Sequence, residues 1–327
     1  MPQKRWVFRL LIVIIAGLFV ASCTKEITGK LPDTGTHLVV DGYIESGQPP
    51  IVLLTRSSKV FGDLNINNIS SFFIHGAKVT VTKDSVQQFH LEEICLRDLP
   101  LADTQKVQLL RALGISVFDS SAVPDVCAYS LPAGDLLNYF SGGGCTLCGE
   151  LDHRYDLKIE ANGQTITSYT TIPSGNPVDS LGISYPAAPA LDSFAGVTLT
   201  VTVPPTYGHF IRYWTKRNNE PFYLPQTQSV YDDKLFIGKT FTLPVERGYP
   251  PTQKVDPEKF GYFMKGDTVT IKWSHIDSRT FDFFYSLESD GSNTPFTSYL
   301  VARSNINGGL GVWAGYGTSY YKIIIPK

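Results

Sequence analysis

Short stretches with β-strand patterning, separated by turn residues, constrain the fold of this chain most strongly. In the clearest pair, residues 155–160 and 164–171, apolar and polar side chains alternate on both sides of Asn162-Gly163. A period of two places one face of a strand against a core, and Asn-Gly supplies the positive φ angles of a two-residue hairpin turn. We therefore predict an antiparallel hairpin here.

Similar stretches recur along most of the chain. We expect further strands at residues 38–44, 51–56, 72–74, 77–82, 197–203, 210–216, 268–273 and 320–325, and we group the aromatic-rich stretch 280–287 with them. Many short strands between Gly, Pro and Asn turns are typical of antiparallel sandwiches. The sequence predicts an all-β fold.

One segment has helical spacing instead. Asp103 or Thr104 can cap a helix in which Val107, Leu110 and Leu113 share one face. Gly114 would end this helix after about ten residues. Such a short helix is an insertion in a sandwich rather than part of a βαβ unit.

The length of 327 residues fits roughly two domains of about 150 residues each. Pro173 and Pro177 lie in a stretch that stops strand pairing, because proline has no N–H to donate. We predict two antiparallel β-sandwich-like domains, residues 37–175 and residues 176–327, with the short helix inserted in the first.

Residues 1–22 have the pattern of a signal peptide. Three basic residues lie among the first nine, and the apolar run 10–20 is too short to span a bilayer, which needs about 20 residues. The run leads into Val20-Ala21-Ser22-Cys23, which resembles the lipobox of bacterial lipoproteins. We predict cleavage before Cys23, lipidation of its thiol by diacylglyceryl and palmitate chains, and a tether over residues 23–36.

Two alternatives to lipidation are an ordinary secreted protein and an uncleaved anchor helix. In lipoprotein sorting, aspartate after the cysteine often means retention in the inner membrane, and Thr24 stands there instead. Lys25-Glu26 resembles a charged surface-display tag. We expect a cell-envelope protein, anchored by lipid to the outer membrane and exposed at the cell surface.

Charge argues against a nucleic-acid partner. Removing residues 1–22 removes three basic residues and no acidic one, so the formal net charge changes from −2 to −5. Nucleic-acid binding usually needs a basic patch.

Four cysteines remain besides Cys23, namely Cys95, Cys127, Cys145 and Cys148. Disulfides are the default in an oxidising compartment, and four cysteines allow three pairings. A redox pair at Cys145-x-x-Cys148 and a zinc site are the alternatives. The flanking glycines favour a loop over the helix start that a redox pair needs, and a four-cysteine zinc site would need a second C-x-x-C.

No catalytic residue, metal site or cofactor is predicted, because signatures such as G-x-S-x-G and H-E-x-x-H are absent from the sequence. The cluster Ser274-His275-Ile276-Asp277 could suggest a triad, but triads assemble across a fold, so a strand end with a turn is favoured. Asp232-Asp233 could hold a cation, although a solvated turn is favoured, because calcium needs six or more oxygens.

Glycines and aromatics alternate in an unusual way after residue 307. Trp313 and Tyr316 lie between glycines there, and Trp214 lies in an aromatic and basic stretch. These three side chains are candidates for a binding surface, since Trp and Tyr offer flat, half-polar contacts. A glycine-bulged strand pair that closes the core, with Trp313 buried, is the favoured alternative.

Four stretches in a particular order resemble a family of Bacteroidota lipoproteins catalogued as domain of unknown function 4249. These are Val39-Val40-Asp41-Gly42 through Ser57, Tyr155-Asp156-Leu157 through Pro173, Asp232 to Phe236 with Gly238-Lys239, and Asn305 through Trp313. The resemblance covers nearly all of the chain after Cys23. It implies an envelope lipoprotein, and such proteins often serve beside TonB-dependent outer-membrane transporters. It implies no reaction.

We therefore expect a non-enzymatic binding or accessory module of the outer membrane, beside a TonB-dependent transporter, with an unknown ligand. A structural or adhesive surface lipoprotein is the alternative, and a hydrolase with an unrecognised site comes third.

Overall fold

The structure is a computed structural model of the 327-residue chain. It describes residues 37–57, 70–99, 102–104, 106, 126–187, 191–250, 253–289 and 302–327. Within these ranges, no helix has both the length and the apolar character needed to cross a membrane. The predicted signal peptide, Cys23 and the tether lie outside the described residues.

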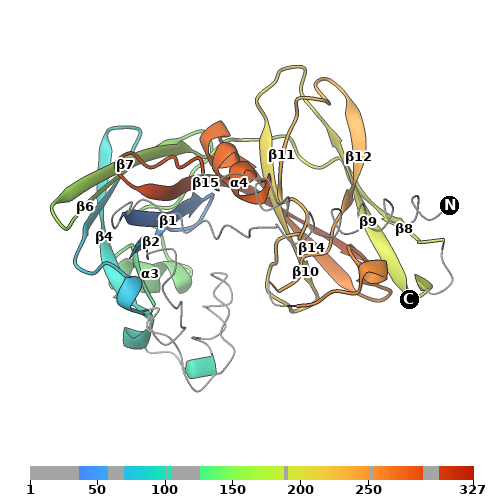
Figure 1. The fold of residues 1–327 in the computed structure, drawn as a ribbon, viewed down its shortest axis with the longest axis horizontal. Coiled ribbons are helices and arrows are strands. Elements are labelled where there is room, and N and C mark those ends of the chain that lie inside the picture. The colour runs from blue at the N-terminus through green and yellow to red at the C-terminus, as the bar shows by residue number, and fades with distance from the viewer. Residues whose placement is uncertain are drawn as a thin grey trace, which may run out of the picture. The chain divides into compact units, whose positions relative to one another are not determined.

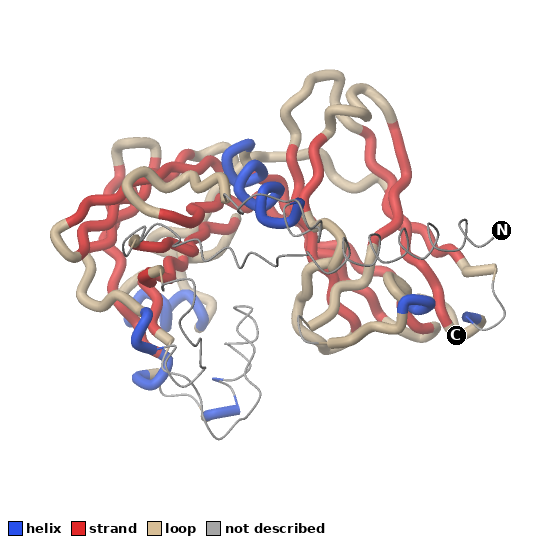
Figure 2. The backbone as a smooth tube through the Cα atoms, in the orientation of Figure 1, coloured by secondary structure: helices blue, strands red, loops and turns tan. Residues whose placement is uncertain are grey.

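Strands are the predominant regular structure of the described chain (Figure 2). They are β1 (Leu38–Glu45), β2 (Ile51–Arg56), β3 (Lys78–Lys83), β4 (Gln87–Cys95), β5 (Cys127–Ser130), β6 (Arg154–Ala161), β7 (Gln164–Thr171), β8 (Ser180–Ser184), β9 (Phe194–Thr202), β10 (Phe210–Arg217), β11 (Val230–Asp232), β12 (Thr240–Val245), β13 (Phe263–Met264), β14 (Thr268–Ile276) and β15 (Leu310–Ile324). Besides the helical residues 103, 104 and 106, α-helices of the described chain include α3 (Ala133–Phe140) and α4 (Ser278–Ser289), and short 3-10 turns include Leu96–Asp98 and Pro257–Lys259.

Eleven strands form one sheet in the order β11-β10-β14-β15-β1-β2-β5-β4-β3-β6-β7 (Figure 1). In a second, four-stranded sheet, β9 pairs with β8, β12 and β13. Within the large sheet, β15 runs antiparallel to β14 and parallel to β1. The prediction of an all-β, sandwich-like fold is confirmed.

The predicted hairpin is present as β6 and β7. Ala161 pairs with Gln164, and the two residues between them, Asn162 and Gly163, have φ angles of 52° and 73°. Positive φ at both turn positions is what a type I′ hairpin requires. The residues Asn162-Gly163 therefore specify the turn of this hairpin.

The first hydrophobic core collects side chains from β1, β2, β3, β6 and β7 around Trp313 of β15. The Trp313 ring is fully buried, and its indole N–H donates a 2.9 Å hydrogen bond to the backbone carbonyl of Tyr155. A buried indole needs such a partner. The ring therefore ties β15 to β6 across the core.

The second core lies between the two sheets. Alternate residues of β9, including Val197, Leu199 and Val201, pack with Tyr213 of β10 and Ile271 of β14. Apolar residues alternate along β9 because one face of this strand turns toward the core. This layered packing is the sandwich that the strand pattern predicted.

Helix α4 corrects the strand expected at 280–287. The Asp277 carboxylate accepts a 2.8 Å hydrogen bond from the backbone N–H of Thr280, which is N-cap geometry. Phe281 and Phe283 are buried. The aromatic run was grouped with strands because short apolar runs do not by themselves distinguish a helix from a strand.

Two other expectations have mixed outcomes. Residues 103, 104 and 106 are helical, but the rest of the helix predicted up to Gly114 lies outside the described residues. The predicted strand at 72–74 is wrong, because only Phe73 pairs there, in an isolated bridge to Thr55. Helix α3 was not expected.

The predicted domain boundary between residues 175 and 176 stays a prediction. The chain carries no strand from 172 to 179, between β7 and β8. However, β15, from the C-terminal half, pairs with β1, from the N-terminal half. One sheet thus contains strands from both predicted domains.

The glycines of β15 permit close backbone contacts. A Cβ added to Gly311, whose φ is +107°, would lie 1.9 Å from the carbonyl oxygen of Val40 in β1. A Cβ at Gly317 would lie 2.0 Å from the carbonyl oxygen of Pro173. Only a residue without a side chain fits at these approaches. The glycines therefore let β15 lie close to β1 and to the connection at Pro173.

We predict that Gly311→Ala lowers the free energy of unfolding by about 2–5 kcal/mol, from overpacking together with backbone strain. The measurement is urea unfolding followed by tryptophan fluorescence. Gly144→Ala is the matched control, since no heavy atom lies within 4 Å of an added Cβ there. Equal unfolding midpoints for the two variants would contradict this account of β15.

Candidate functional site

An apolar pocket opens between the two sheets near the ends of β9, β10 and β14. Its volume is about 420 Å³, within the range of ordinary small-molecule sites. One wall comes from the end of β9 and from β12, and the opposite wall comes from β10, β11 and β14. The site therefore belongs to the C-terminal sandwich.

Aliphatic and aromatic side chains form the walls. Val201, Val203 and Leu243 line one side, and Ile211 and Trp273 line the other. All five belong to the second core or pack against it, and all but Val203 lie on strands. Such walls can exclude water from an apolar group of a ligand.

Phe236 and Phe241 add an aromatic edge to the same pocket. Their rings stack with centroids 4.0 Å apart. Phe236 follows β11 and Phe241 belongs to β12, so the stacked pair joins the two walls at this edge.

The polar part of the rim is organised by Asp233. Its carboxylate is buried and accepts hydrogen bonds from the backbone N–H groups of Gly208 and His209, both at 3.2 Å, and from Nδ1 of His209 at 2.8 Å. These bonds fix the loop before β10. Since this carboxylate is engaged by the loop, the cation site considered for Asp232 and Asp233 gains no support.

Trp273 has an unusual position in the wall. The side chain is buried, and its indole N–H finds no acceptor among the described residues. A buried donor without a partner costs about 1–3 kcal/mol. Because this N–H has almost no accessible surface, Trp273 contributes ring surface to the pocket and not an accessible donor.

His275 also lines the pocket, next to the strand-free connection between β7 and β8. Its Nε2 lies 3.2 Å from the carbonyl oxygen of Asn176 and donates to it, and the ring packs on Gly175, where an added Cβ would lie 2.1 Å from ring atoms. Burial holds the pKa of His275 below its ordinary value, and the nearby His209 lowers this pKa further. The ring therefore favours its neutral form.

The cluster at 274–277 does not form a triad. The Ser274 hydroxyl lies 2.8 Å from that of Thr318, and His275 bonds to Asn176. Asp277 caps α4 and also accepts from the hydroxyl of Thr170 at 2.8 Å. The three polar side chains thus serve three different structural contacts.

The structure places two of the three aromatic candidates in the interior. Trp313 and Tyr316 are both buried, so neither ring offers a binding surface in this conformation. The alternative, in which Trp313 lies in the core, agrees with this placement. Trp214 is half-buried, and its ring packs edge-on against Tyr316 with centroids 5.5 Å apart.

Tyr316 belongs to a polar layer beneath α4. Its hydroxyl accepts a 3.1 Å hydrogen bond from the buried Arg212 guanidinium, which also stacks on Phe284 of α4 at 3.3 Å. Burial raises the pKa of Tyr316, and Arg212 opposes this shift. Lys272 forms a 2.5 Å ion pair with the buried Glu45 on the same side of the sheet. This layer supports the fold rather than a free surface.

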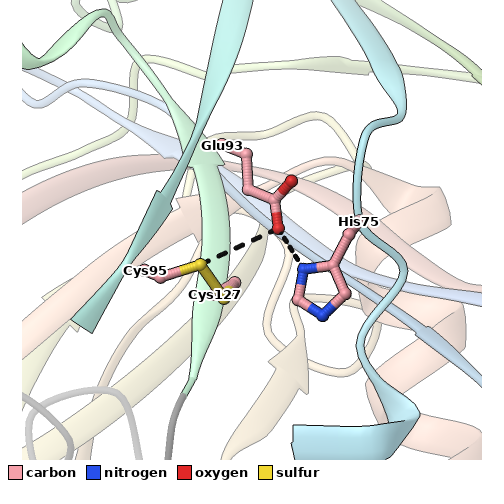
Figure 3. Close-up of side chains that lie close together, drawn as sticks. All are labelled: His75, Glu93, Cys95 and Cys127. Carbon is pink, nitrogen blue, oxygen red and sulfur yellow. Dashed lines mark hydrogen bonds and ion pairs between the residues drawn. A yellow bond between two sulfur atoms is a disulfide. The ribbon is translucent and has the colours of Figure 1, made fainter. Parts of the chain in front are cut away.

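The four cysteines form two disulfides, Cys95–Cys127 and Cys145–Cys148, so the disulfide prediction is confirmed and its pairing resolved. The first joins β4 to β5. Two residues that sequence reasoning did not select, His75 and Glu93, lie beside it (Figure 3). They are 18 positions apart, and no local pattern links them.

Comparison with known proteins places the chain in one family. No curated protein matches it. A family profile described as "Domain of unknown function (DUF4249)" matches residues 24–322. Since this range covers well over half of the 327 residues, the chain belongs to the DUF4249 family.

Proposed function

We propose that the chain is a lipid-anchored binding module of the outer membrane, and that it holds an apolar group of its ligand in the pocket of the C-terminal sandwich. The observation that carries this proposal is an apolar space of about 420 Å³ lined by residues such as Val201, Leu243 and Trp273. Apolar walls with a few polar groups are typical of small-molecule sites.

The ligand class follows from the walls and the rim. The preferred ligand has an apolar body that fits between these walls. It is neutral or cationic rather than anionic, since Asp232 and Asp233 lie at the rim. A small lipid, or an apolar side chain of a partner protein, has this chemistry.

Binding is favoured over hydrolysis by the state of the pocket's hydroxyl groups. The Thr202 hydroxyl bonds to Asp179 and Thr240 at 2.7 Å, and the Thr242 hydroxyl to Thr200 at 2.8 Å. Both threonine hydroxyls therefore bond to groups other than the two histidines of the pocket, and the Tyr231 hydroxyl donates to the backbone carbonyl of Gln228. None of these three hydroxyls is engaged in the hydroxyl–histidine pair that commonly activates a nucleophile.

The proposed location rests on the sequence. The family match begins at residue 24, directly after the predicted lipidated Cys23. A TonB-dependent transporter is the proposed neighbour, and the module would present or retain its ligand there. Recovery of such a transporter with the wild-type chain from mild detergent would support the accessory role.

We predict that a neutral naphthylamine dye binds the full chain saturably at one site. Leu243→Trp should weaken this binding by about tenfold or more, because the larger ring fills the pocket, and a tenfold change corresponds to about 1.4 kcal/mol. The readout is dye fluorescence. Thr240→Trp is the matched control, since Thr240 lies on the same strand but is exposed and does not line the pocket. Equal affinities for both variants, or no saturable binding, would favour the structural role instead.

His275 gives a second prediction, on pH. Its folded-state pKa lies below the unfolded value of about 6.5, so the unfolded chain takes up a proton first as pH falls. The free energy of unfolding should therefore decrease as pH falls from about 7 through 6.5 to 5, above the range where ordinary carboxylates titrate. Urea unfolding across this range measures it. His275→Gln should flatten the dependence, and His90→Gln, at an exposed site, should not.

Lipidation gives a third prediction. In a Gram-negative host, the wild-type chain should sediment with membranes, and mass spectrometry should find a mature N-terminus at an acylated Cys23. Two or more acyl chains make anchoring stable. Cys23→Ser should move the chain to the soluble fraction, while Cys148→Ser should not. Membrane sedimentation of Cys23→Ser as firm as that of wild type would remove the proposed anchor.

A further inference from the structure

Three separate segments bring four metal-binding side chains together in the N-terminal half. His75 lies before β3, Glu93 and Cys95 belong to β4, and Cys127 begins β5 (Figure 3). One ligand atom from each lies within 4.8 Å of the others. The arrangement depends on strand register, because Cys95 and Cys127 are directly opposite residues of β4 and β5.

Glu93 lies at the centre of this cluster. It is two residues before Cys95, so both side chains leave the same face of β4. One carboxylate oxygen contacts Nδ1 of His75 and lies 3.8 Å from Sγ of Cys95, while the other accepts a 2.9 Å hydrogen bond from the backbone N–H of Gly76. One carboxylate oxygen therefore links the imidazole of His75 to the sulfur of Cys95.

Tyr129 holds the segment that carries His75. Its hydroxyl donates a 2.7 Å hydrogen bond to the carbonyl oxygen of Ile74 and accepts a 3.0 Å bond from the N–H of Ala77. Tyr129 is two residues after Cys127 on β5, so the same strand positions one sulfur and the histidine segment. Ligands held in this way need little rearrangement to bind an ion.

We propose that reduction of the Cys95–Cys127 disulfide converts this cluster into a Zn²⁺ site with His75 and Glu93 as the other two ligands. Two thiolates, one imidazole and one carboxylate form a four-ligand set of the kind that Zn²⁺ takes in tetrahedral sites. The disulfide and the metal site exclude each other, because a thiolate, not a disulfide sulfur, is the ligand.

Reduction of the Cys95–Cys127 disulfide requires an external reductant, such as a dithiol. A dithiol gives two electrons and two protons to the S–S bond, forming the Cys95 and Cys127 thiols and its own disulfide. Zn²⁺ then binds the two sulfurs with release of the two thiol protons. The His75 side chain is 55% exposed, so the ion can approach from that side.

The test uses the full chain with Cys23→Ser, Cys145→Ser and Cys148→Ser, which leaves only the thiols of the proposed site. A water-soluble phosphine reduces the disulfide, taking oxygen from water to become the phosphine oxide. Anaerobic titration with Co²⁺, a coloured substitute for Zn²⁺, should then give a near-ultraviolet thiolate-to-cobalt band at one ion per chain, and Zn²⁺ should abolish it. The oxidised protein should show no band.

His75→Ala and Glu93→Gln, made in the same background, should each weaken Co²⁺ binding about tenfold or more, since each removes a ligand. His90→Ala is the control, because His90 lies on β4 but bonds to Thr80 instead. Absence of the band from the reduced protein, a band unchanged in His75→Ala, or loss of circular dichroism on reduction without metal binding would each overturn the proposal.

Discussion

Strand β15 joins two neighbours in succession, because its residues 310–316 pair with β1 and its residues 317–324 pair with β14. Its side chains enter three separate hydrophobic clusters. Trp313 fills the first core, Ile323 packs on the second, and Tyr316 lies under α4 in the third. Because β15 contributes side chains to all three clusters, a shift in its pairing register would affect the packing of each cluster.

The pocket depends on the same strand. His275 of β14 is paired with Gly317 of β15, and Trp273 is paired with Ser319. Gly317 in turn lets the connection at Pro173 pass close to β15. The alignment of β15 therefore sets the positions of Trp273 and His275 in the pocket wall, although β15 itself contributes no residue to that wall.

Sequence reasoning succeeded where local chemistry decides. Asn162-Gly163 specifies its own turn, and alternation along β9 specifies which face is buried. It failed at α4, because a run of aromatic residues has no decisive period and the N-cap, Asp277, was weighed instead as a member of a triad. It could not find the pocket or the His75–Glu93 contact. Both depend on which distant strands pair and on the register of that pairing, and a single sequence does not contain this information.

The disulfide between β4 and β5 joins strands that other pairings already hold. β4 also pairs with β3, and β5 with β2, so both strands keep a neighbour on the far side when the S–S bond is reduced. Closing a loop of this separation, 32 residues, contributes about 4 kcal/mol in the chain-entropy description. Structural Zn²⁺ sites contribute about 10 kcal/mol or more at neutral pH. A bound ion can therefore offset the loss of the disulfide, and the sheet can keep one alignment in both states.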